Sequence, residues 1–73
     1  MELTGIIEDI IYKNETNGYT IATFQMESSE TTVVGYLPFI QKGDSLKVIG
    51  KFVTHPDYGE QFKVETFEKI MPQ

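Results

Sequence analysis

The sequence predicts an all-β protein that folds as a small barrel of five strands. Val, Ile and Thr number 21 and Phe and Tyr number nine, whereas Ala and Leu together number only four. The first group favours strands and the last favours helices. Apolar residues alternate with polar ones in short runs that are separated by Gly-, Asn- or Pro-containing turns. A chain of 73 residues has room for one domain, which we assign to residues 1–73.

The first strand is predicted over residues 2–13 and must contain an irregularity. Ile7 and Ile10 have odd and even numbers, so in a regular strand their side chains would point to opposite faces. This alternation changes only where an extra residue is inserted. We place a β-bulge at Glu8-Asp9, where it would bend a long first strand. The alternative is a short helix over residues 6–11, which the β-branched residues of this segment disfavour.

The second and third strands are predicted on either side of a polar turn. Asn17-Gly18 is a strong hairpin signal because both residues tolerate positive φ, so a second strand is expected over residues 19–26. Residues 27–30 form the polar turn, and a third strand follows over residues 31–36.

The longest break in the strand pattern covers residues 37–44. Its proline and glycine allow at most one short helical turn, near residues 38–42. A fourth strand is expected over residues 45–54, a turn over residues 55–59, and a fifth strand over residues 61–69.

Five strands, a long bulged first strand and a wide gap after the third indicate an OB-fold-like barrel. An SH3-like barrel is the main alternative, but it usually places its long loop between the first two strands, where this chain has a tight turn. Strand parity predicts the core residues: Leu3, Ile7, Ile10, Ile21, Phe24, Val34, Leu46, Val48, Phe52, Phe62 and Val64.

Several kinds of chemistry are excluded by the residue inventory. The chain has no cysteine and a single histidine, His55, so disulfides, thiolate metal sites and multi-histidine sites are ruled out. Glu8 and Asp9 are adjacent on a strand and point to opposite faces, so they are a poor acid–base pair. The only Gly-Lys pair, Gly50-Lys51, lies mid-strand without the glycine-rich loop of an ATPase. We therefore expect a non-catalytic chain without catalytic residue, cofactor or metal.

Charge favours only weak binding to nucleic acid. The net charge is −5 and the chain has no arginine, which is the wrong sign for a free-standing binder of phosphates. Residues 40–55 carry a local charge of +2, however, and the rest of the chain carries −7. OB-folds grip single strands with basic grooves and aromatic side chains. The residues of these types that border turns or flank apolar strands are the candidate nucleic-acid site: Tyr12, Lys13, Tyr19, Lys51, Tyr58 and Lys63.

Four stretches of the sequence resemble one protein family. They are Ile11–Ala22 (IYKNETNGYTIA), Thr32–Gly35 followed by Leu37-Pro38, Gly43–Leu46 followed by Gly50, and His55–Glu65 (HPDYGEQFKVE). These stretches are similar to the N-terminal domain of the RecD-like ATP-dependent DNA helicases, relatives of the exodeoxyribonuclease V alpha chain. The last stretch is the most specific, because it holds His-Pro, Tyr-Gly and Gln-Phe in the family's order.

The resemblance implies that this chain is an OB-like N-terminal fragment of a larger helicase. The implied parent is a hydrolase that uses ATP and Mg²⁺ to separate DNA strands in DNA repair or recombination, and neither ligand is expected to bind this fragment. Two roles stay open for the fragment: weak guidance of single-stranded DNA, or docking on the motor domain or on a partner protein without contact to DNA. No membrane segment or signal peptide is apparent, so we expect a cytoplasmic monomer that contacts the remaining helicase domains.

Overall fold

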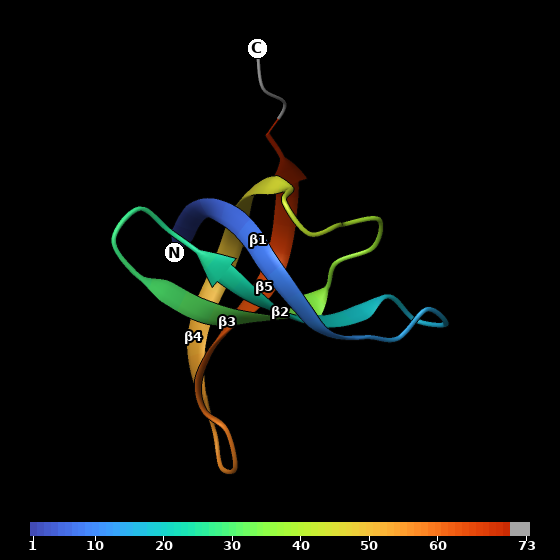
Figure 1. The fold of residues 1–73 in the computed structure, drawn as a ribbon. Helices are drawn as coiled ribbons and strands as arrows, with labels where there is room; N and C mark the ends of the chain where they lie inside the picture. Colours follow the sequence, from blue (N-terminus) through green and yellow to red (C-terminus); the bar gives the residue numbers. More distant parts are fainter. Residues whose placement is uncertain (71–73) are drawn as a thin grey trace.

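The computed structural model describes residues 1–70, and all its regular structure is β (Figure 1). The prediction of an all-β barrel is confirmed, and no helix is present in the described part of the chain; residues 38–39 and 42–43 form turns. The predicted strand limits are correct to within two residues. The five strands are β1 (Glu2–Lys13), β2 (Tyr19–Gln25), β3 (Glu30–Tyr36), β4 (Ser45–His55) and β5 (Gly59–Lys69).

The strands close into a barrel in the order β1-β2-β3-β5-β4. β3 and β5 run parallel, and every other neighbouring pair, including the β1–β4 pair that closes the barrel, is antiparallel. A small, closed Greek-key barrel of five strands is the OB architecture. The longer gap after β3 is what allows β4 to cross the barrel and pair with β1.

β1 bends twice, and each bend coincides with an extra residue in the strand. Its register against β2 shifts between Ile7 and Asp9 and again between Ile10 and Tyr12. The first shift confirms the bulge predicted at Glu8-Asp9, and the second, at Ile11, was not predicted. The bends let the first half of β1 pair with β4 and the second half pair with β2.

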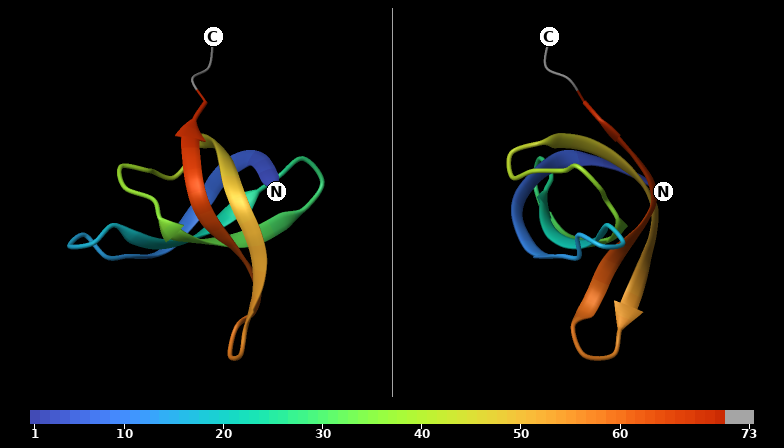
Figure 2. Two further views of the ribbon diagram at one scale, coloured as in Figure 1. Left: turned by 180° about the vertical axis from the view of Figure 1, so that it is seen from behind. Right: turned by 90° about the vertical axis from the view of Figure 1, so that its right-hand side faces the viewer.

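The core fills the barrel and is closed at one end by the loop between β3 and β4. Leu37 and Ile40 of this loop are buried, and the loop is tied to β1 by backbone hydrogen bonds between Ile7 and the segment Gly43-Asp44. The right-hand view of Figure 2 shows this yellow-green loop lying across the barrel opening. The buried cluster consists of Ile7, Ala22, Phe24, Val33, Leu37, Ile40, Leu46, Val48, Phe62 and Val64.

Two predicted core residues of the middle strands lie on the outer face of the barrel. Ala22 pairs with Val33 and both fill the interior, so the next pair, Ile21 and Val34, points outward. Val34 is nevertheless buried, whereas Ile21 is only half-buried. Val34 is thus buried as predicted, whereas Ile21 was wrongly assigned to the core, because parity alone does not show which of Val33 and Val34 faces the interior. Leu3 and Ile10, also predicted as core, are half-buried and pack against the cluster.

Phe52 was also wrongly assigned to the core, since 37% of its surface is exposed. It has the inward parity of Leu46 and Val48 but lies where β4 and β5 continue past the barrel. Both views of Figure 2 show the β4–β5 hairpin projecting as a long arm. The Phe52 ring contacts the buried Phe62 edge to face, with ring centroids 5.0 Å apart.

Candidate nucleic-acid interface

An outward row of side chains crosses all five strands of the barrel. Register places Tyr12 beside Ile21, Ile21 beside Val34, Val34 beside Lys63, and Lys63 beside Lys51. Residues directly opposite on neighbouring strands share a face of the sheet. Four strand spacings separate the two ends of the row, which is about 19 Å measured along the sheet. We call these five residues the cross-barrel row.

The cationic end of the cross-barrel row is a pair of lysines with the same charge. Lys51 and Lys63 face each other across β4 and β5, and both are exposed. The strands come unusually close here, because a Cβ on Gly50 would overlap the carbonyl oxygen of Lys63. Like charges directly opposite each other destabilise a sheet. The pair therefore concentrates positive charge at this end of the row.

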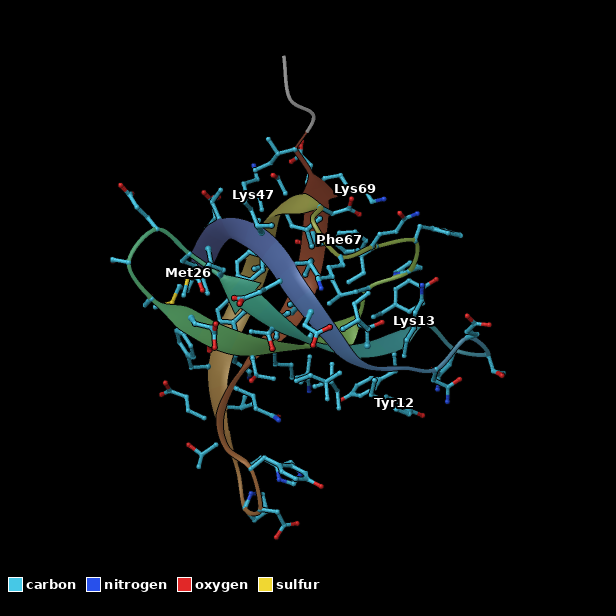
Figure 3. The ribbon with its side chains drawn as sticks, viewed as in Figure 1. Tyr12, Lys13, Met26, Lys47, Phe67 and Lys69 are labelled. Carbon is cyan, nitrogen blue, oxygen red and sulfur yellow. The ribbon has the colours of Figure 1, made fainter. Side chains whose placement is uncertain are left out.

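The lysines that form ion pairs lie elsewhere in the structure. Lys47 is 3.3 Å from Glu68, and Lys69 is 3.2 Å from Asp44. Figure 3 shows Lys47 and Lys69 near the carboxyl end of β5, well away from Tyr12. Within residues 1–70, Lys51 and Lys63 have no acidic partner within ion-pair distance. Their positive charge is thus available to a ligand.

The opposite end of the row is aromatic and adjoins the β1–β2 turn. Tyr12 is half-exposed, and Figure 3 shows it on the side of β1 toward which the β4–β5 arm projects. Asn14 orders the turn, because its side-chain oxygen accepts hydrogen bonds from the backbone N–H groups of Thr16 and Asn17 at 2.9 and 3.3 Å. Gly18 has a φ of 77°, which confirms the predicted positive φ at this position.

The β4–β5 arm carries a second aromatic group at its tip. The rings of His55 and Tyr58 stack with centroids 4.8 Å apart, and Tyr58 is largely exposed. His55 Nδ1 accepts a hydrogen bond from the backbone N–H of Asp57 at 3.0 Å. His55 is the last residue of β4, at the start of the turn predicted over residues 55–59.

The six predicted site residues thus divide between the barrel wall and its two projecting hairpins. Tyr12, Lys51 and Lys63 belong to the cross-barrel row, with Ile21 and Val34 between them. Lys13 and Tyr19 lie at the base of the β1–β2 turn, and Tyr58 lies at the tip of the other hairpin.

Two exposed aromatic residues near this surface were missed by the sequence reasoning. Tyr36 is opposite Tyr19 on the outer face, and its ring lies against Gly18. Phe39 is in the β3–β4 loop and is 81% exposed. The signal that was overlooked is the run from Tyr36 to Ile40, which is more apolar than a surface loop requires.

Neither a metal site nor a membrane-spanning helix is found among the described residues. Within residues 1–70, no three His, Asp or Glu side chains are grouped so that they would hold a metal ion. None of the elements described is a long apolar helix able to cross a bilayer.

One comparison with known proteins gives a family. The family model described as "ATP-dependent DNA helicase YrrC, OB-fold domain" matches residues 1–72. No solved structure matches the chain. The family match covers nearly the whole sequence and agrees with both the barrel topology and the resemblance seen in the sequence motifs.

Proposed function

Because the chain belongs to the family of OB-fold domains of YrrC-type, RecD-like ATP-dependent DNA helicases, we propose that it guides single-stranded DNA toward the helicase motor. The cross-barrel row is the observation that carries this proposal. It places an unpaired lysine pair, the half-buried Ile21 and an aromatic end along one outward row of the barrel. Single-strand binders use this combination of phosphate contacts and stacking surfaces.

The proposed arrangement assigns different parts of the strand to different parts of the row. Lys51 and Lys63 hold phosphate oxygens, and their mutual repulsion falls when an anion lies between them. The half-buried Ile21 offers an apolar contact to the bases beside the buried Val34, and Tyr12 offers a ring. A row about 19 Å long suits a site at the small end of the OB-fold range, about four nucleotides.

Binding by this chain alone should be weak, which suits a guide rather than an anchor. The chain carries −5 overall, so long-range repulsion opposes the local attraction of the lysine pair. We place ATP, Mg²⁺ and the chemistry of strand separation in the motor domains of the parent helicase, outside this chain. In the proposed assembly the domain is monomeric and contacts the motor and one DNA strand.

Charge also favours one alternative, a module that docks on the motor or on a partner protein without contacting DNA. The acidic residues Glu8 and Glu30 adjoin each other on β1 and β3, and their interaction raises the pKa of Glu30. An acidic surface of this kind complements a basic protein surface. The two roles differ in whether the isolated chain binds DNA.

The test uses two single-charge variants of the full chain, Lys63→Gln and Lys47→Gln. Fluorescence anisotropy with a labelled oligothymidine of about 15 nucleotides is measured at about 50 mM salt. Lys63→Gln should weaken binding several-fold, whereas Lys47→Gln should leave it nearly unchanged, because Lys47 is paired with Glu68 away from the row. Both variants change the net charge equally. An equal loss in both variants, or no binding by the native chain, would favour the docking module.

A further inference from the structure

Phe39 combines two features that are costly for folding. It is 81% exposed, and its φ of 64° is the one positive value among the non-glycine residues from 1 to 70. A bulky residue in the left-handed region is strained, and such strain persists only where the surrounding structure holds it. An exposed aromatic ring on a strained backbone gains nothing from burial. This points to a role outside folding.

A compact network holds the backbone of Phe39 in this conformation. The Lys69 ammonium group donates a hydrogen bond to the carbonyl oxygen of Phe39, and it is 3.2 Å from the carboxylate of Asp44. Asp44 in turn accepts a hydrogen bond from the backbone N–H of Gln41 at 2.9 Å. The Gln41 N–H and the Lys69 ammonium together lower the pKa of Asp44, so the network stays charged at neutral pH. The loop is therefore ordered, and its ring is presented to solvent.

The ring of Phe39 borders a hollow between the β3–β4 loop and the β1–β2 turn. The hollow has a volume of about 300 Å³, and its walls include Tyr36, Phe39 and Lys13. This volume is at the lower end of the range for small-molecule sites. The lining also includes the carboxylate of Glu15, so Lys13 supplies the one positive charge of the hollow beside one negative charge. Two aromatic rings and one ammonium group are side chains that can stack on a base and contact its phosphate.

The hollow is continuous with the cross-barrel row. Tyr36 faces Tyr19 across β3 and β2, two residues along from the outward pair Val34 and Ile21. A strand that lies on the row and continues toward the β1–β2 turn reaches the hollow without leaving this face. A pocket that bound a side chain of a partner protein would need neither a connection to the cross-barrel row nor a lysine at its rim.

We infer that this hollow binds one unpaired nucleobase of the single strand that follows the cross-barrel row. The base stacks on Phe39 or Tyr36, and Lys13 contacts the adjoining phosphate. This inference rests on the proposed function and adds to it a base subsite outside the barrel wall. Phe39 is a binding residue, and Lys69 and Asp44 are positioning residues that set its ring.

The test compares Phe39→Gly with Phe39→Tyr and Phe39→Leu in the full chain. Glycine accepts the positive φ, tyrosine keeps a ring, and leucine keeps an apolar side chain without a ring. The probe is a single-stranded oligonucleotide that contains 2-aminopurine, whose fluorescence is quenched when the base stacks. We expect Phe39→Gly and Phe39→Leu to weaken binding at least about fivefold and to lose quenching, and Phe39→Tyr to retain both.

The possible failures are distinguishable. Suppose that the native chain binds the oligonucleotide, that Lys63→Gln weakens this binding, and that Phe39→Gly does not. The proposed base subsite is then wrong, and the proposed function stands. If the native chain binds no oligonucleotide at low salt, both are wrong. Retention of binding by Phe39→Leu without quenching would reassign the hollow to general apolar contact and overturn the stacking role. Circular dichroism of each variant checks that the barrel is intact.

Discussion

Among single residues, Gly18 is constrained both by its backbone conformation and by a neighbouring side chain. Its φ of 77° favours glycine, and a Cβ there would lie 2.6 Å from the ring of Tyr36. Gly59 has nearly the same φ, 80°, but open space around it. We expect Gly59→Ala to cost about 1–2 kcal/mol from backbone strain alone, and Gly18→Ala to cost more because Tyr36 must also move. Thermal unfolding of the two variants measures the difference. Equal losses would mean that the Tyr36 ring is not fixed against the turn.

Glu30 is a second informative residue, because its carboxyl group interacts with a like-charged neighbour. A hydrogen bond and repulsion from Glu8 raise the pKa of Glu30 above its ordinary value. A carboxyl group with a raised folded-state pKa contributes stability below its unfolded pKa, and this contribution is lost as the pH rises through the folded value. Glu30→Gln should therefore raise the melting temperature at about pH 7 and have no such benefit at about pH 3. A benefit of equal size at both pH values would show that charge repulsion is not the cause.

Among the elements, the β4–β5 hairpin shows how position along a strand decides burial. Phe62 is buried at the barrel wall, whereas its partner Phe52 lies where the arm begins. Phe62→Ala should cost about 3–5 kcal/mol, a large share of a total stability of roughly 4–11 kcal/mol for a chain this long. Phe52→Ala should cost only about 1–2 kcal/mol, mostly the ring contact. Chemical denaturation of both variants gives the two values, and similar losses would mean that the arm is part of the core.

The strands were predictable from the sequence because alternation and turn residues are local signals. Their faces were less predictable, because irregularities reset the parity. β5 has an extra residue at Glu65, between the residues paired with Ile49 and Gly50, so Phe67 packs against the core although its parity differs from that of Phe62. Likewise, both Val33 and Val34 are apolar, and only the pairing with β2 and β5 decides which one faces inward.

For the molecule as a whole, the sequence predicts the members of the interface better than it predicts their arrangement. The adjacency of Lys51 and Lys63 follows from the register of a single hairpin. The path from Lys63 through Val34 and Ile21 to Tyr12 depends on the parallel β3–β5 contact and on the second bulge of β1, which no local pattern specifies. The exposure of Phe39 depends on a loop that closes the barrel with Leu37 and Ile40 and turns the intervening ring outward.

The charge distribution of the whole molecule leads to a final prediction about salt. The lysines proposed to meet DNA are Lys13, Lys51 and Lys63, on a chain with a net charge of −5. Each phosphate neutralised on a single strand contributes about −0.7 to the slope of log affinity against log salt, so the slope should be about −2. Binding should be measurable at low salt, fade toward physiological salt and differ little between base sequences, because stacking and phosphate contacts carry little sequence information.

A salt series with the native chain and with the double variant Lys51→Gln/Lys63→Gln measures this salt dependence. The double variant should reduce the slope by about 1.4. An unchanged slope would place the phosphate contacts elsewhere, and tight binding that resists salt would mean that the aromatic residues dominate.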